Sequence, residues 1–407
     1  MGSHFESLAS VSWRVRHFAI VLIPLFGLGT AAWADDDARP EHPVVPSISH
    51  AITSYIEEKE VAGAVTLVAD DTAIWHLHAD GLADRSRSEP MRSDSIFWIA
   101  SMTKPITATA VLMLQDQGKL NVEDQVETYL PEFKGLKTRS GQPARLTIKH
   151  LLTHTSGLSE ATPDQARSAT NLASLIPFYV AKPVGFEPGS KWAYCQSGIN
   201  TAARIVEVVS GEDFPAFLQK HLFDPLGMKD TTFYLSDSQA PRLAKSYRKA
   251  ESGDLVEAPI RILHGMSPTS RDRFPAANGG LFSTAEDYAR FCQMILNKGT
   301  YQGHRFLKVE SVELMTSVRT EELKTGFTPG NGWGLGWCVV RSPQGVTAAL
   351  SPGSFGHGGA YGTQAWIDPV RKRIDILMVQ RENFPNADAS QVRVRFEQEA
   401  AKPRAKP

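Results

Sequence analysis

The sequence is poor in cysteine, in net charge and in long apolar runs. Three cysteines among 407 residues can form at most one bridge, which excludes a disulfide-stapled fold. A formal net charge of -1 and the lack of a basic block give no electrostatic basis for binding nucleic acid or an anionic membrane surface. After residue 34, no stretch has the roughly 20 apolar residues that a bilayer span requires, so no stable membrane span is expected.

The composition is that of a chain with a substantial hydrophobic core. The 407 residues are 42% hydrophobic and 21% charged, and the length exceeds the ~100 to 200 residues of one simple domain. We therefore expect two lobes whose stability comes from packing.

The N-terminus has the pattern of an export signal. Arg14 and Arg16 precede the apolar run 18–28, and Ala32-Trp33-Ala34 provides a small-x-small cleavage pattern. The alternative is an uncleaved anchor, but a run of about eleven residues interrupted by a proline falls short of a span. We predict a signal peptide over 1–34, cleaved after Ala34, and a periplasmic or secreted product.

The rest of the chain divides into segments with different helix and strand patterns. After a polar linker, 35–46, the pattern predicts a helix over 47–60 and a hairpin of strands 63–69 and 72–78. Strand patterns return late, over 333–340, 363–368 and 373–379, and early and late strands would share one sheet. Short helical patterns cut by prolines lie between them. The predicted organisation is a discontinuous α/β lobe (47–130 and 273–400), a mainly helical lobe (131–272) and a disordered tail (401–407).

Ser101 and Lys104 are the first candidates for chemistry. They lie one helical turn apart, so the amine can reach the hydroxyl, and Pro105 prevents the helix from beginning earlier than about Ser101. The long apolar run that follows would bury the pair and lower the proton affinity of the lysine. A neutral amine could then act as a base.

Spacing alone does not identify a nucleophile. Ser246 and Lys249 have the same spacing within a polar run, which we interpret as a solvated face. Cys195, beside Tyr194, lacks a flanking pattern for a nucleophile and is expected to be a small buried residue.

Histidine pairs give no support for a metal site. His76 and His78 share a strand face and are expected to be exposed, with no third ligand near in sequence. His150 and His154 have helical i,i+4 spacing, but the glutamate of a zinc-protease helix is missing between them. No metal or other cofactor is predicted.

Three motifs in order resemble the serine beta-lactamase superfamily of penicillin-recognising enzymes, in its class C-like branch with esterases and D-amino-acid peptidases. Ser101-x-x-Lys104 matches the first motif of that superfamily. Tyr194-Cys195-Gln196 stands where the family has tyrosine-x-asparagine, and His357-Gly358-Gly359 stands where it has lysine-threonine-glycine. The stretches 151–158, 225–228 and 278–281 also look like this branch. The resemblance spans roughly residues 47–395.

The resemblance implies a fold and a set of roles. The fold would be α/β (α+β), an antiparallel sheet flanked by helices with an inserted mainly helical lobe. Ser101 would form an acyl-enzyme, Lys104 would accept or relay its proton, and Tyr194 would assist, with the nearby amine favouring its phenolate. The backbone N–H groups of Ser101 and Ala360, the latter on the strand after Gly359, would bind the oxyanion.

Departures from the family motifs bear on the substrate. Gln196, His357, Gly358 and Gly359 would contact it, but His357 is mostly neutral at pH 7 where the family has a fixed lysine near the substrate carboxylate. We therefore expect an exported serine hydrolase, foremost a carboxylesterase, that acts on a small-molecule ester, lactam or D-peptide. The alternatives are a beta-lactamase or D-amino-acid peptidase on the same scaffold, or an inactive relative that binds cell-wall peptides. Oligomeric state stays open.

Overall fold

The computed structural model describes residues 42–326, 328–384 and 387–403. The predicted signal peptide and the end of the predicted tail, from residue 404, lie outside this part of the chain. Among the helices that are described, none combines the length and apolarity needed to cross a membrane.

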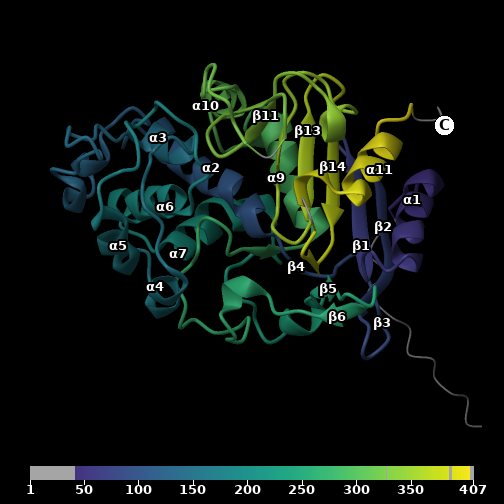
Figure 1. Cartoon of the computed structure of the whole chain (residues 1–407). Coiled ribbons are helices and arrows are strands. Elements are labelled where there is room, and N and C mark those ends of the chain that lie inside the picture. Colours follow the sequence, from purple (N-terminus) through teal and green to yellow (C-terminus); the bar gives the residue numbers. More distant parts are fainter. Residues whose placement is uncertain (1–41, 327, 385–386, 404–407) are drawn as a thin grey trace, which may run out of the picture. The chain divides into compact units, whose positions relative to one another are not determined.

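Within the described residues, the main sheet has eight strands, all paired antiparallel, in the order β10-β11-β12-β13-β14-β1-β2-β3 (Figure 1). Its strands are β1 (Gly63–Ala69), β2 (Ile74–Asp84), β3 (Glu89–Pro90), β10 (Asn331–Trp333), β11 (Cys338–Val340), β12 (Phe355–Gly358), β13 (Gln364–Asp368) and β14 (Arg373–Met378). Leu67 of β1 lies opposite Ile376 of β14. The prediction that early and late strands share one sheet is confirmed.

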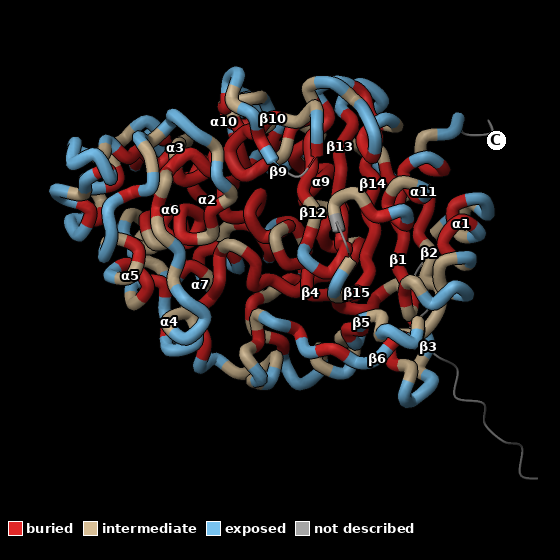
Figure 2. Tube along the Cα trace, viewed as in Figure 1, coloured by how far each residue is buried: buried red, intermediate tan, exposed pale blue. Residues whose placement is uncertain are grey.

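Helices cover both faces of this sheet. The α-helices are α1 (Pro46–Glu57), α2 (Thr103–Asp116), α3 (Ile148–Leu152), α4 (Pro163–Ser168), α5 (Ile176–Val180), α6 (Gln196–Ser210), α7 (Phe214–Leu218), α8 (Asp224–Leu226), α9 (Ala285–Leu296), α10 (Val309–Thr316) and α11 (Gln391–Ala400). Side chains alternate along a strand, so Ala64 and Val68 pack in one cluster with α1 and α11, whereas Val65 and Leu67 pack in another with α2 and α9. Strand β1 is therefore buried at every position, as Figure 2 shows.

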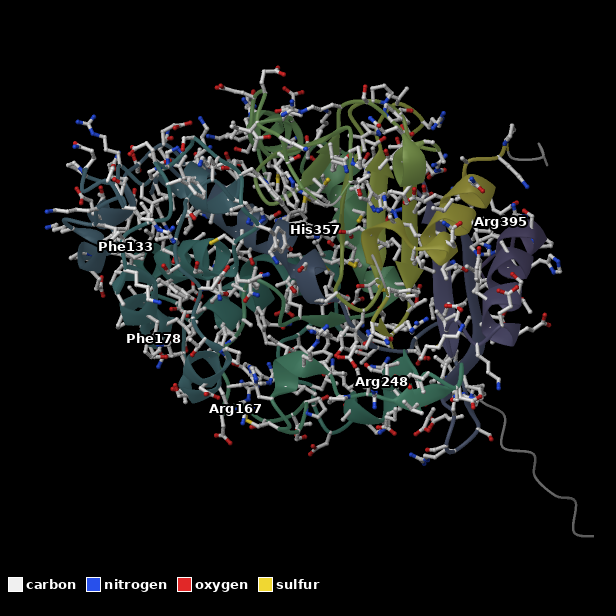
Figure 3. The ribbon with its side chains drawn as sticks, viewed as in Figure 1. Phe133, Arg167, Phe178, Arg248, His357 and Arg395 are labelled. Atoms are coloured by element: carbon white, nitrogen blue, oxygen red, sulfur yellow. The ribbon has the colours of Figure 1, made fainter. Side chains whose placement is uncertain are left out.

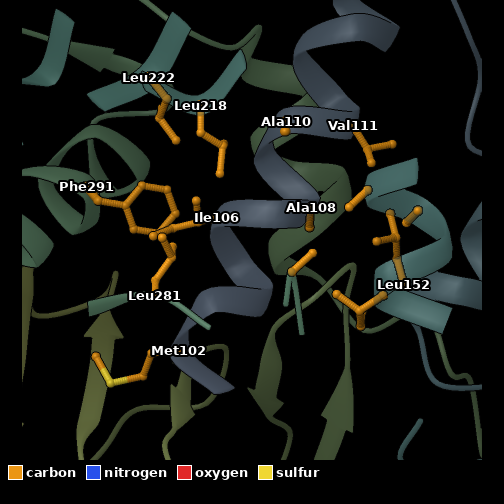
Figure 4. Packing of buried hydrophobic residues seen from close by; sticks show 14 of the residues in the cluster. Met102, Ile106, Ala108, Ala110, Val111, Leu152, Leu218, Leu222, Leu281 and Phe291 are labelled. Carbon is orange, nitrogen blue, oxygen red and sulfur yellow. The ribbon is translucent and has the colours of Figure 1, made fainter. Parts of the chain in front are cut away.

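Helix α2 is the central helix of the larger cluster. Every residue from Thr103 to Leu114 is buried, which is typical of a helix surrounded by protein rather than of a surface helix. Figure 4 shows its sides meeting different elements: Ile106 lies near Leu281 and Phe291, and Val111 points toward the opposite side from Ile106. The helix that follows Ser101 is thus fixed on all sides.

One expected strand is a hairpin. The run 333–340 was expected as a single strand, but it contains the end of β10 and all of β11, which pair antiparallel, with Trp333 opposite Cys338. Gly336 turns the chain at φ +75°, and the N–H of Gly334 donates to the carbonyl of Trp337 at 2.9 Å. The prediction of one continuous strand is wrong because these glycines form a turn.

Two smaller expectations also need correction. His76 is buried rather than exposed: its Nδ1 accepts the N–H of Val45 at 2.9 Å, and its Nε2 lies 2.9 Å from Thr66 Oγ1. The chain before α1 covers this face of β2. Ser246 is also buried, bonded to Gln380 at 3.0 Å, and precedes strand β5 (Tyr247–Lys249).

Short strands complete the described fold. Strand β5 lies between β6 (Leu255–Glu257) and β15 (Arg381–Glu382), β4 (Phe97–Trp98) pairs with β7 (Phe282–Ser283), and β8 (Thr300–Tyr301) pairs with β9 (His304–Arg305). Strand β4 of the β4–β7 pair immediately precedes the Ser101 segment in the chain. It fixes where that segment enters α2.

Candidate active site

Ser101 and Lys104 are in contact at the head of α2. Lys104 Nζ lies 3.0 Å from Ser101 Oγ and donates to the carbonyl of Asn278 at 2.6 Å. Ser101 is half-buried, within a short 3-10 helix, Ala100–Met102, that leads into α2. The predicted pairing of hydroxyl and amine is thus present in the structure.

The backbone before Ser101 is strained. Ala100 has φ +46°, a left-handed conformation that an alanine rarely adopts. Its carbonyl accepts the Thr103 hydroxyl at 2.7 Å, and the Trp98 indole donates to the carbonyl of Gly279 at 2.6 Å. These contacts hold the sharp turn that presents the serine.

Lys104 lies in a desolvated position. It is fully buried, and burial lowers its pKa to about 7, against the opposing influence of the Glu160 and Asp388 carboxylates. A substantial fraction of this amine is therefore neutral near neutral pH. The nitrogen that touches Ser101 can accept a proton.

Tyr194 completes the group. Its hydroxyl is hydrogen-bonded to Ser101, and Lys104 Nζ lies 4.6 Å from the centroid of its ring. Burial raises the pKa of Tyr194 above its ordinary value, more than the bond to Ser101 lowers it. The phenolate that the sequence led us to expect is thus disfavoured, because desolvation outweighs the nearby amine.

His357 lies on β12, in the middle of the view of Figure 3. Its ring centroid is 6.2 Å from that of Tyr194 and 5.3 Å from that of Trp333. Nδ1 lies 2.7 Å from the carbonyl of Gly358, which can only accept, so Nδ1 carries the proton and Nε2 is an acceptor. Burial lowers the pKa of His357 to about 3, with Lys104 adding to the effect, so the ring is neutral.

The turn that carries the predicted oxyanion donor Ala360 packs against the segment before Ser101, through Thr363 Oγ1 and the carbonyl of Ile99 at 3.4 Å, but one expectation needs correction. Strand β12 ends at Gly358, and Ala360 is exposed in the turn that follows rather than on the strand. The turn forms because Gly362 adopts φ +93° and donates to the carbonyl of Gly359 at 3.0 Å. Among the described residues, the Ala360 N–H makes no hydrogen bond to another backbone group.

Gly359 allows this turn to approach the serine segment. A Cβ at Gly359 would lie 1.9 Å from Thr363 Oγ1 and 2.7 Å from the carbonyl of Ile99, two residues before Ser101. Both distances are impossible for a real side chain. The glycine therefore sets how closely the end of β12 packs against the nucleophile.

Gln196 is connected to Lys104 through Asn278, a residue for which no role was predicted from sequence. Its Oε1 accepts from Asn278 Nδ2 at 2.9 Å, and Asn278 in turn receives Lys104 at its carbonyl. Glu160 caps the start of α6, accepting the N–H groups of Gln196 at 2.5 Å and Ser197 at 3.0 Å. Asn278 lies in the stretch 278–281 that resembled the family, whereas Glu160 carried no signal.

The remaining candidates have structural contacts. His154 follows the end of α3 instead of continuing it, and its buried ring lies 4.4 Å from that of Tyr194. Cys195 is buried and free, as predicted, and burial raises the pKa of its thiol to about 11. No group of three or more potential metal ligands occurs among the residues described.

The comparisons with known proteins agree with this geometry. The beta-lactamase family model matches residues 48–400, and the chain belongs to that family. The protein is therefore a beta-lactamase-family serine hydrolase with the beta-lactamase/transpeptidase fold.

Two relatives and one solved structure illustrate the similarity. Protein Rv1367c of Mycobacterium tuberculosis is 33% identical over 360 residues, covering 81% of this chain and 88% of its own. Esterase EstB of Burkholderia gladioli is 30% identical over 343 residues, covering 77% of this chain and 84% of its own. The structure of EstCE1, described as a hydrolase with promiscuous acyltransferase activity, superposes with a TM-score of 0.75 at 21% identity, covering 88% of this chain and 98% of that one.

Proposed function

We propose that the protein is a carboxylesterase that works through an acyl-Ser101 intermediate. The observation that carries the proposal is the 3.0 Å contact between Ser101 Oγ and the buried amine of Lys104. The relative EstB, whose name records esterase activity, supports the same substrate class.

The contacts support the following sequence of steps. Neutral Lys104 takes the Ser101 proton as Oγ forms a bond to the ester carbonyl carbon, and the resulting oxyanion accepts from the N–H groups of Ser101 and Ala360. The bond to the alcohol oxygen then breaks, and the proton held on Lys104 reaches that oxygen through the neutral phenol of Tyr194. Water next attacks the acyl carbon, Lys104 takes a proton from it, and the carboxylic acid leaves as Ser101 Oγ regains a proton.

The state of His357 favours esters over the alternative substrates. Beta-lactams and D-peptides of this kind bring a carboxylate to the third motif, and a neutral ring whose Nδ1 proton is already donated to Gly358 offers it neither charge nor donor. A beta-lactamase or D-amino-acid peptidase is therefore the second candidate. An inactive binding relative is disfavoured by the intact contact of Ser101 with Lys104.

A labelling experiment combined with two substrates tests the proposal. We expect a fluorophosphonate probe to label the purified protein, and p-nitrophenyl butyrate to be cleaved much faster than nitrocefin. Ser101→Ala should abolish labelling and lower kcat by about 10³-fold or more. Preferential nitrocefin turnover would support the second candidate, and the absence of labelling would support the inactive relative.

We also propose that the protein is exported with cleavage after Ala34. The N-terminal pattern of basic residues, an apolar run and small residues supports this. N-terminal sequencing of the protein from its native host should begin at Asp35. A mature protein that retains residues 1–34 would contradict it.

A further inference from the structure

Tyr194 lies in a short irregular stretch before α6, where neither a helix nor a strand fixes its backbone. A group that passes a proton must nevertheless be held within about 0.5 Å of its working position. The contacts that hold the Tyr194 hydroxyl beside Ser101 must therefore come from another part of the chain.

His154 contacts the backbone on both sides of Tyr194. Its carbonyl accepts the Ala193 N–H at 2.9 Å. Its Nδ1 lies 3.1 Å from both the N–H and the carbonyl oxygen of Cys195, so either neutral tautomer makes one hydrogen bond to that backbone. Within the described part of the chain, Nε2 has no hydrogen-bond partner. The hydrogen bonding of this ring is therefore directed to the residue next to Tyr194.

The ring of His154 also packs against the phenol itself. The ring centroids of His154 and Tyr194 are 4.4 Å apart, and the Trp333 ring meets the histidine edge-to-face at 4.8 Å. His154 is completely buried, whereas Tyr194 is half-buried. The histidine thus backs the tyrosine, whose hydroxyl is bonded to Ser101.

The backbone at His154 is strained. The residue follows the C-cap of α3 with φ +60°, and the N–H of Thr155 donates to the carbonyl of His150 at 3.0 Å, as in the common glycine-terminated helix end. Glycine is usual at such a position because it has no Cβ. A buried histidine there indicates that the side chain does something that glycine could not do.

We propose that His154 is a positioning residue: by binding the backbone of Cys195, it holds the Tyr194 hydroxyl where it can protonate the leaving alcohol. This inference rests on the proposed esterase mechanism and adds a residue to it. In the step concerned, the ester C–O bond breaks, the phenol gives its proton to the alcohol oxygen, and it regains one from the Lys104 ammonium. His154 acts only through Tyr194.

Two butyrate esters separate this role from a general structural one. p-Nitrophenolate leaves without a proton, whereas the ethoxide of ethyl butyrate must be protonated as it leaves. Both esters form the same acyl-enzyme, so the ratio of kcat/KM for p-nitrophenyl butyrate to that for ethyl butyrate measures proton delivery. A general loss of folded protein affects both esters alike. Fluorophosphonate labelling, in which fluoride leaves without a proton from the phenol, counts the competent Ser101 sites.

Variants of the two residues should change this ratio. Tyr194→Phe should raise it by about 10²-fold, through the loss of the general acid. His154→Phe, which keeps a ring but cannot bind Cys195, should raise it by about tenfold through misplacement of the phenol, and so should His154→Ala if the phenylalanine variant does not label. Adding His154→Ala to Tyr194→Phe should raise it no further, because the histidine acts through the phenol.

A conservative variant and a matched control complete the test. His154→Asn should keep the ratio within about twofold of the wild type, because its amide can bind Cys195 in place of Nδ1 and asparagine tolerates the left-handed backbone. His150→Asn is the control, since the Nδ1 of His150 accepts the Thr147 N–H of its own helix at 3.2 Å, and the ratio should not change.

The outcomes distinguish the inference from the proposed function. A wild-type ratio in both His154→Phe and His154→Ala, or the same rise in His154→Asn as in His154→Ala, overturns the inference and leaves the esterase proposal standing. An unchanged ratio in Tyr194→Phe overturns the role of the phenol and the inference with it. Absence of both ester cleavage and labelling in the wild type overturns the esterase proposal itself.

Discussion

Burial gives Lys104 and Tyr194 different roles at Ser101. Desolvation disfavours the charged form of each, so the amine becomes a neutral acceptor whereas the phenol keeps its proton. In the mechanism that we propose, the lysine is the base of the acylation step, and the tyrosine passes a proton to the leaving alcohol. This assignment has consequences for pH dependence and for stability.

The activity should depend on the protonation of Lys104. Its pKa is lowered to about 7 and the deprotonated amine is the active form, so kcat/KM should rise as pH increases through about 7 and then level off. Steady-state assays with a neutral ester between pH 5 and 9 measure this. Lys104→Arg, which stays charged, should show no such rise, and a wild-type profile that is flat through this range would contradict the assignment.

The burial of the Lys104 amine should lower the free energy of unfolding at neutral pH. Its pKa falls from the ordinary 10.5 to about 7 on folding, so between these values the unfolded chain binds more protons and stability rises with pH. Lys104→Met fills the same space without a charge, and we expect it to raise the free energy of unfolding by about 1–3 kcal/mol at pH 7 while abolishing activity.

Denaturant unfolding at pH 7 and at pH 10 checks this effect. The advantage of Lys104→Met over the wild type should shrink at the higher pH, because pH 10 approaches the ordinary pKa of 10.5, so protonation of the unfolded chain favours unfolding less than it does at pH 7. A variant that is less stable than the wild type at both values would show that the bonds of Lys104 to Ser101 and Asn278 outweigh its desolvation.

At the scale of elements, the turn after β12 matters most for the site. It contains Ala360 and packs against the carbonyl of Ile99, and it closes through Gly359, whose N–H donates to the carbonyl of Thr363 at 2.7 Å. Tyr361, in the same turn, is buried and donates to the carbonyl of Pro259 at 2.7 Å. The turn is thus anchored on two sides.

Gly359→Ala should disrupt the oxyanion site. The added methyl would meet the carbonyl of Ile99 at 2.7 Å, so the turn must move away from the serine segment. We expect kcat to fall by about 10²-fold, the scale of losing one oxyanion donor, with a smaller effect on KM. Gly185→Ala, at an exposed position where the methyl has only an ordinary contact at 3.6 Å, is the matched control and should keep wild-type kinetics.

At the scale of the whole molecule, three histidines of the described part of the chain are buried in neutral form. His76 lies beneath the chain before α1, and His154 and His357 lie beside Tyr194. Burial lowers the pKa of His76 to about 4 and of His357 to about 3, and it lowers that of His154 well below its ordinary value. Each must gain a proton on unfolding in mild acid.

The protein should therefore lose stability between pH 6.5 and about 4. In that range the unfolded chain binds more protons than the folded one, so the free energy of unfolding falls as pH falls, by on the order of 3 kcal/mol from His76 alone. Urea unfolding at pH 7 and 4.5 measures the loss. His76→Gln should reduce the difference between the free energies of unfolding at pH 7 and pH 4.5, whereas His304→Gln, at an exposed histidine, should not. The same difference in both variants would contradict the role given to His76.

Much of the site was predictable from sequence because its signals are local. Ser101 and Lys104 are one turn apart, and Pro105 with the apolar run fixes the helix start and its burial. Tyr194 and His357 came from motifs that resemble the family. In the structure Tyr194 lies beside Lys104, and His357 lies beside Tyr194. Strand periodicity predicted β1 over the residues that form it.

Tertiary structure alone decided what depends on neighbours far along the chain. Glu160 and Asp388 stand 228 positions apart in the chain, and only the fold brings both carboxylates within electrostatic reach of the Lys104 amine. The burial of His76, the neutral phenol of Tyr194 and the tautomer of His357 depend likewise on what packs around each ring. Sequence determined which groups can react, since reactivity belongs to residue type and local spacing, whereas the fold determined their protonation, since desolvation is a property of the surroundings.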